Sequence, residues 1–266
     1  MRKIWHGAIA GMGLLLMMAG PALAAVKQAD GDDAARPLPA VAEELFTMAN
    51  QSRAESGAKP LVWDPALAEA AMQHCLRMAA NGPISHRYDG EADLLSRAKA
   101  AGAHFSQIEE NIAFGSRAVV IHQGWMHSPG HRTNLLNPDV DRVGVAAVAS
   151  QGVIFAVADY ARGVPVLTAP EVEAAIAGLI RADGLAVSRE ARDARLACTV
   201  DQGVPASADP RPRFIFRWQG AELTRLPQEL DTMLASREYR RAAVGSCPPS
   251  GSQGGFTVYR VAVLLY

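Results

Sequence analysis

The chain has few cysteines and few aromatic residues, and neither sign of charge dominates it. It holds three cysteines in 266 residues, 6% aromatic residues and a formal net charge of −1. So few cysteines exclude a small domain that several disulfides hold together. The balanced charge gives no electrostatic basis for binding nucleic acid, and no cluster of basic residues would attract anionic lipid. We therefore expect a globular protein with a hydrophobic core and no nucleic-acid partner.

The sequence also lacks an apolar run of the roughly 20 residues that cross a membrane. The run Ala8–Gly20 follows Arg2 and Lys3 and precedes the small residues of Ala22-Leu-Ala24. A basic start, a short apolar run and a small-residue motif make up a secretory signal peptide. We predict cleavage after Ala24, no membrane span, and a periplasmic or secreted location. The alternative, a short membrane anchor, is disfavoured by the length of the run.

The positions of the three cysteines predict one disulfide. Export would place them in an oxidising compartment, where thiols pair. Cys198 and Cys247 stand at the edges of turn-rich segments, whereas Cys75 stands inside an apolar helical pattern. We predict a disulfide between Cys198 and Cys247, and a buried, unpaired Cys75.

Hydrophobic patterning after the signal peptide predicts helices first and a sheet later. Residues 25–39 are small, polar and acidic, which is typical of a disordered leader. Asp64 before Pro65 predicts a helix start, because Asp caps free N–H groups and Pro fits the first turn. Two β-rich runs joined around Ser150–Gly152 predict an antiparallel hairpin. This order indicates an α+β fold in which helices cover an antiparallel sheet. We expect helices over 40–56, 64–80, 91–101 and 117–127 and a strand over 108–115.

The segment Gly163–Pro170 divides the chain into two parts. Its Gly and Pro residues interrupt the pattern between the hairpin and a new helix. We expect a domain at 40–163, a linker at 164–170 and a smaller α+β module at 171–266, in which about 100 residues and a disulfide suffice for a core. In the module we expect helices over 171–182 and 226–236 and strands over 214–218 and 256–266.

Three polar residues of the first domain are candidate site residues. His86 follows the second helix in GPISHRYDG, Glu110 begins a strand in EENIAFG, and His131 follows a helix in WMHSPGHRTNLL. In the last motif, Pro129 ends the helix and Gly130 lets the chain turn. We therefore expect His131 in a loop that faces His86 and Glu110.

Neighbouring residues have structural interpretations. His127 precedes the break and is expected at the surface. Trp125 and Phe114 fit the role of core aromatic residues, and the amides of Asn111 and Asn134 can satisfy backbone groups that irregular segments leave open.

Two imidazoles and a carboxylate support three interpretations. They suit a zinc site with one open position, where the metal would lower the pKa of a bound water to about 7. Without metal, Glu110 and a histidine could act as a general base and its orienter. The three could also form a structural hydrogen-bond cluster. Ser85 and Ser128 also stand near histidines, but neither has the strand–turn–helix context of a serine nucleophile.

These motifs, in this order, resemble the bacterial branch of the CAP superfamily, which comprises cysteine-rich secretory proteins, antigen 5 and pathogenesis-related proteins. The resemblance extends over about residues 40–162 and rests on the His86 loop, E-N-I-A-x-G, W-M-x-S-P-G-H-R-x-N-x-L-x-P and x-V-G-V. It implies an α-β-α sandwich whose cleft holds two histidines and up to two acidic residues. His86, Glu110 and His131 match three of these by motif. Ser128 stands where the eukaryotic pattern has the second glutamate, so one acidic residue is missing.

The resemblance implies a binding or interaction module as the first hypothesis. Its cleft would hold a divalent metal such as zinc, through His86, His131 and Glu110, or a small apolar, lipid-like ligand. A cell-wall component or a protein is an alternative partner. The second hypothesis is a zinc-dependent hydrolase that acts on peptides or the cell wall, with Glu110 as its catalytic residue. The third is a structural extracellular protein.

Overall fold

The computed structural model describes residues 34–249 and 256–266. The predicted signal peptide, its cleavage after Ala24 and most of the leader lie outside these residues. Among the helices that are described, none combines the length and the apolar character that a membrane span requires.

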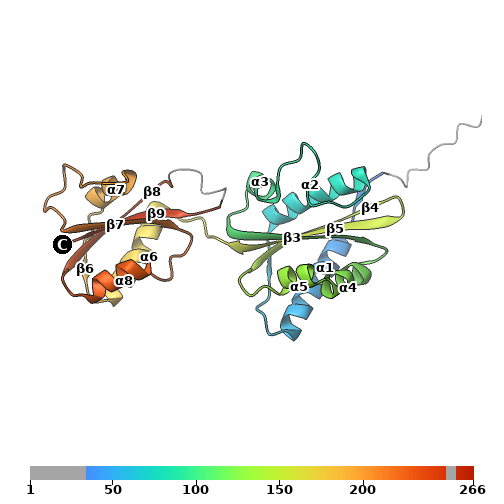
Figure 1. Ribbon diagram of the computed structural model, residues 1–266, viewed down its shortest axis with the longest axis horizontal. Helices are drawn as coiled ribbons and strands as arrows, with labels where there is room; N and C mark the ends of the chain where they lie inside the picture. Colours follow the sequence, from blue (N-terminus) through green and yellow to red (C-terminus); the bar gives the residue numbers. More distant parts are fainter. Residues whose placement is uncertain (1–33, 250–255) are drawn as a thin grey trace, which may run out of the picture. The chain divides into compact units, whose positions relative to one another are not determined.

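The first part of the chain is an antiparallel sheet between two layers of helices. In the sheet, strands follow the order β1-β4-β5-β3, and β2 pairs in parallel with β4. Helices α2 and α3 cover one face and α1, α4 and α5 the other (Figure 1). This arrangement confirms the predicted α-β-α sandwich. The helices are α1 (Pro39–Glu55), α2 (Pro65–Asn81), α3 (Leu94–Ala100), α4 (Ala118–His127) and α5 (Pro129–Leu136), and the strands are β1 (Arg36–Pro37), β2 (Val62–Trp63), β3 (Phe105–Gly115), β4 (Arg142–Ser150) and β5 (Val153–Gly163).

Local sequence explains how α2 starts and how closely it packs. The carboxylate of Asp64 accepts hydrogen bonds from the N–H groups of Ala66 and Leu67, and Pro65 occupies the first turn, as predicted. Gly144 of β4 lies directly beneath this turn. A Cβ at Gly144 would lie 2.0 Å from the backbone nitrogen of Ala68, so the helix approaches the strand more closely than any side chain would allow.

The structure corrects three predictions in this part. The helix expected over 91–101 begins only at Leu94. Asp93 caps it, and the carboxylate of Glu91 bonds to the His74 ring and the Tyr88 N–H group instead. Arg36–Pro37, expected in a disordered leader, pair with β4, which would otherwise lack a neighbour there. The side chain of Phe114, expected in the core, is exposed. Trp125 is buried, as predicted.

The second part of the chain is a smaller sheet with helices on both faces. Its strands follow the order β6-β8-β9-β7. Helices α6 and α8 cover one face and α7 the other (Figure 1). The elements are α6 (Ala169–Ala182), β6 (Ala186–Val187), α7 (Arg192–Thr199), β7 (Phe214–Gly220), α8 (Gln228–Ala235), β8 (Arg241–Cys247) and β9 (Tyr259–Leu265). Strands β6 and β8 were not among the predicted elements. The disulfide between Cys198 and Cys247 is confirmed, and Cys75 is buried and free.

The predicted boundary coincides with the end of β5. Hydrophobic clusters before Gly163 join the first sheet to its helices, and those after it join the second sheet to α6, α7 and α8. The linker is only partly exposed, because Val164 packs into the second core whereas Val166 is 73% exposed. The division into independently folding domains stays a prediction.

Gly144→Ala should destabilise the first domain, since α2 leaves no room for a methyl group on β4. We expect a loss of about 3 kcal/mol or more in the free energy of unfolding, because neither backbone can move without disturbing the core. Gly124→Ala in α4 is the matched control: a Cβ there meets nothing within 4 Å, and Ala should favour the helix by about 0.5–1 kcal/mol. Urea unfolding measures both. Wild-type stability in Gly144→Ala would contradict the close packing of α2 on β4.

Candidate functional site

The candidate site lies at β3, an edge strand of the first sheet. Glu110 stands in the middle of this strand, and its side chain is only 3% exposed. One carboxylate oxygen, Oε1, accepts a hydrogen bond from His86 Nδ1 at 2.8 Å. The other, Oε2, accepts one from Arg97 Nη2 at 2.5 Å. Glu110 therefore forms a buried ion pair with Arg97 and holds the ring of His86.

Arg97 also fixes the loop that carries His86. This residue lies in α3 and is buried, and its Nη1 donates to the carbonyl oxygens of His86 at 3.3 Å and Ala92 at 3.1 Å. The same guanidinium thus bonds to the loop backbone and to Glu110. Its charge is compensated without access to water.

His74 of α2 also holds the loop that carries His86. Its ring is fully buried. Nδ1 lies 2.7 Å from Glu91 Oε1, and Nε2 lies 3.0 Å from the carbonyl oxygen of Ser85. The sequence does not mark His74 or Arg97 as part of the site, because a histidine or an arginine inside a helix has no distinguishing signal without its partners.

Asp159 is a second buried carboxyl group beside Glu110. It stands on β5 directly opposite Glu110 in the strand register, and it is 0% exposed. Among the described residues, no group donates a hydrogen bond to either of its oxygens. Burial, and next the charge of Glu110, raise the pKa of Asp159 well above its usual range. Burial beside Glu110 therefore favours the neutral form of Asp159, in which the pair carries one negative charge.

His131 reaches the site from the opposite side of the sheet. It lies in the first turn of α5 rather than in a loop, because Pro129 starts a new helix immediately after α4 ends. Asn111 Nδ2 donates to the carbonyl oxygen of His131 at 2.8 Å. Burial lowers the pKa of His131, and the nearby charge of His86 lowers it further. His131 is thus a neutral imidazole near His86 at neutral pH.

A buried arginine holds α5 in place. Arg53 of α1 is fully buried, and its guanidinium donates to four backbone carbonyl oxygens, those of Lys59, Leu135, Asn137 and Val140, at 2.7–3.2 Å. Three of these acceptors follow or end α5. The predicted contacts of the amides with backbone groups also form, since Asn111 Nδ2 donates to the carbonyl oxygen of His131 at 2.8 Å and Asn134 Nδ2 to that of Glu110 at 3.3 Å.

The remaining histidines and serines form no catalytic pair among the described residues. His127 is exposed and its Nδ1 bonds to the Gln123 carbonyl oxygen of its own helix, in agreement with the predicted surface position. The hydroxyl of Ser85 donates to the Arg87 carbonyl oxygen rather than contacting a histidine. One serine–histidine contact was not predicted from the sequence: Ser52 Oγ lies 2.9 Å from His122 Nε2. Nδ1 of this ring has no partner in the described part of the chain, so no acid orients it.

The site residues do not fit a zinc centre with three protein ligands. Both oxygens of Glu110 are already bonded, to His86 and Arg97. Within residues 34–249 and 256–266, no group of three or more His, Cys, Asp and Glu side chains is arranged to hold a metal ion. Glu110 instead resembles the outer-shell carboxylate of a metal site, because it bonds to Nδ1 of His86 and orients the ring without being a ligand itself.

Comparisons with known proteins agree with this fold and these motifs. Residues 46–160 match the Cysteine-rich secretory protein family, CAP. This part of the chain is a CAP domain. The chain is 35% identical over 107 residues to the uncharacterized membrane protein YlbC of Bacillus subtilis (strain 168), a match that covers 39% of this chain and 30% of that protein. It is 29% identical over 109 residues to the uncharacterized protein YkwD of the same organism, covering 41% and 42%. The chain thus spans less than half the length of these curated relatives.

Solved structures with similar folds also match about half of the chain. An extracellular protein containing a SCP domain from Bacillus anthracis is 30% identical, with a TM-score of 0.43, and the match covers 47% of this chain and 41% of that one. An outer surface protein from Borrelia burgdorferi is 19% identical, with a TM-score of 0.46, and the match covers 49% of this chain and 99% of that one.

Asp159→Asn should stabilise the protein at neutral pH. The raised pKa of Asp159 means that its contribution to stability is fully present below the unfolded value near 3.8 and is lost as pH rises toward the folded value. An amide of the same size avoids this loss, because it does not titrate. The variant's advantage in the free energy of unfolding by urea should therefore grow as the pH rises from about 4.5, by at most about 1.4 kcal/mol per pH unit. If the difference in the free energy of unfolding between the variant and wild type did not change with pH, Asp159 would not be buried as a neutral acid.

Proposed function

We propose that this protein is an exported binding protein, and that its CAP domain contacts its ligand at the exposed face formed by His86 and His131. The observation that carries this proposal is the orientation of His86. Its Nδ1 is bonded to the buried Glu110, while its side chain is 59% exposed. The ring is thus held from inside and presents its other nitrogen outward. Export is supported by the predicted signal peptide and by the Cys198–Cys247 disulfide, which is typical of oxidising compartments.

The protonation states of the two rings indicate what they would bind. The hydrogen bond that His86 donates to Glu110 raises the pKa of His86, although partial burial lowers it. The pKa of His131 is lowered, so this ring stays neutral. A donor whose protonated form is favoured, beside a neutral ring, suits a ligand with an anionic or carbonyl oxygen at one end. The polar end of a lipid-like molecule or a cell-wall fragment has such groups.

Binding is favoured over hydrolysis because Glu110 is not free to accept a proton from water. Its carboxylate oxygens bond to Arg97 and His86, and the side chain is buried. A general base needs direct or water-mediated access to the proton that it takes. Glu110 therefore serves as a positioning residue for His86 rather than as the catalytic residue of a hydrolase.

A divalent metal is a second candidate ligand of the same face. His86 and His131 would hold it through their outward nitrogens, and Glu110 would orient His86 from behind. A metal bound there would supply a Lewis acid for a ligand oxygen. With two imidazoles as its protein ligands, such a site would be weak, and binding should fall as the pH decreases, beginning above pH 6.5 because the pKa of His86 is raised.

Native mass spectrometry of protein purified from its host distinguishes these ligands by mass. We expect a bound organic ligand, or zinc that a chelator removes, on wild type. His131→Ala should lose this added mass, because the variant lacks one of the two rings. His127→Ala is the matched control and should keep it, since this exposed ring bonds only to its own helix.

Two results would contradict the proposal. If His127→Ala lost the added mass and His131→Ala kept it, the ligand would be bound by His127 and not by His131. Absence of any bound ligand or metal on wild-type protein from its host would reject a binding role for this face.

A further inference from the structure

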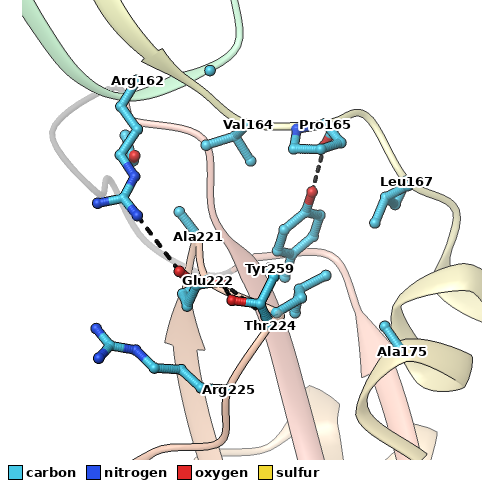
Figure 2. A pocket seen from close by; sticks show the side chains of 13 residues that line it. Arg162, Val164, Pro165, Leu167, Ala175, Ala221, Glu222, Thr224, Arg225 and Tyr259 are labelled. Carbon is cyan, nitrogen blue, oxygen red and sulfur yellow. Dashed lines mark hydrogen bonds and ion pairs between the residues drawn. The ribbon is translucent and has the colours of Figure 1, made fainter. Parts of the chain in front are cut away.

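A pocket that is separate from the His86–His131 face lies around the linker after β5, and Ser106 of β3 and Arg162 and Gly163 of β5 line it together with residues of the second part of the chain. Its volume is about 650 Å³, which is within the range of small-molecule sites. Figure 2 shows that the linker after β5, helix α6, the loop after β7 and Tyr259 of β9 form its walls. The lining is not uniform, and its charges and apolar groups lie on different sides.

The apolar side of the pocket comes from the linker and α6. It is formed by Val164, Pro165, Leu167 and Ala175, and in Figure 2 the last two lie on the side away from the charged groups. The hydroxyl of Tyr259 donates to the Pro165 carbonyl oxygen, which fixes the ring beneath the linker. A hydrocarbon or an aromatic ring of a ligand would displace water from this side.

The charged side of the pocket carries an exposed arginine, Arg225, that has no ion-pair partner in the described part of the chain. Glu222 is fully engaged, because its Oε1 accepts from the N–H and hydroxyl of Thr224 and its Oε2 lies 3.5 Å from Arg162 Nη2. Arg225, in the loop after β7, also lines the pocket. Among the described residues, no carboxylate or carbonyl oxygen pairs with its guanidinium.

We infer that this pocket binds a small organic anion with an apolar body, whose charged group pairs with Arg225 and whose body lies against Val164, Leu167 and Ala175. Charge complementarity selects the anion, since Glu222 is already neutralised and Arg225 is not. An arginine guanidinium forms paired hydrogen bonds with carboxylate or sulfonate oxygens. This site is independent of the ligand proposed for the CAP domain.

Two fluorescent probes that differ in charge test the inference. 1-Anilinonaphthalene-8-sulfonate is an apolar anion, and N-phenyl-1-naphthylamine is its neutral counterpart. We expect wild type to bind the sulfonate about tenfold more tightly than the neutral probe, as one charge-assisted pairing would give. This preference should disappear in Arg225→Gln. Arg181→Gln is the matched control, because Arg181 is an exposed arginine near the end of α6 that does not line the pocket.

A second variant tests the location independently of charge. Ala175→Phe places a ring inside the pocket and should weaken the binding of both probes by about tenfold or more, because the ring occupies the space of their apolar bodies. The melting temperature of each variant shows whether it remains folded. Unchanged binding of the sulfonate in Arg225→Gln or in Ala175→Phe would place the probe elsewhere and overturn the inference. An equal loss in Arg181→Gln, or no saturable binding to wild type, would overturn it as well.

Discussion

The buried ion pair between Arg97 and Glu110 is the interaction on which the candidate site depends. Removing two charges from water is costly, and only close contact with additional hydrogen bonds compensates that cost. Here the contact is 2.5 Å, and Arg97 also donates to two loop carbonyl oxygens. The ion pair therefore connects α3, the His86 loop and β3. Loss of either partner would leave an unpaired charge in the interior.

The rest of the site follows from the position of Glu110 at a sheet edge. Because β3 has β5 on one side only, a loop from the α2 face and helix α5 from the other face can both reach it. His74 holds the loop and Arg53 holds α5, each through buried hydrogen bonds. The imidazole of His86 thus faces solvent, and its hydrogen bond to the buried Glu110 sets its position. This pre-set position of the ring is the feature that supports the proposed binding role.

The sequence predicted the parts of this fold that local rules determine. The Asp64–Pro65 helix start, the Ser150–Gly152 hairpin and the cysteine pairing depend on residues that carry their own signal. Glu110, His86 and His131 were identified through motifs. Arg97 and His74 were not, since their roles exist only once three elements meet. Asp159 offered a usable signal, a carboxyl group within the apolar strand Val153–Gly163, whose meaning becomes clear only beside Glu110. The second part of the chain has no such motifs, and both β6, of two residues, and β8, with its small residues, were missed.

The central claim is that buried Glu110 holds His86 while His131 stays neutral. Titration of the histidine rings by NMR in the wild-type protein tests it most directly. His86 should lose its proton at a pH above the ordinary value of 6.5, and His131 should lose its own at a pH below that value. The hydrogen bond to Glu110 is the cause of the first shift, and burial is the main cause of the second. A reversed order, or a pKa of His86 below 6.5, would contradict the account.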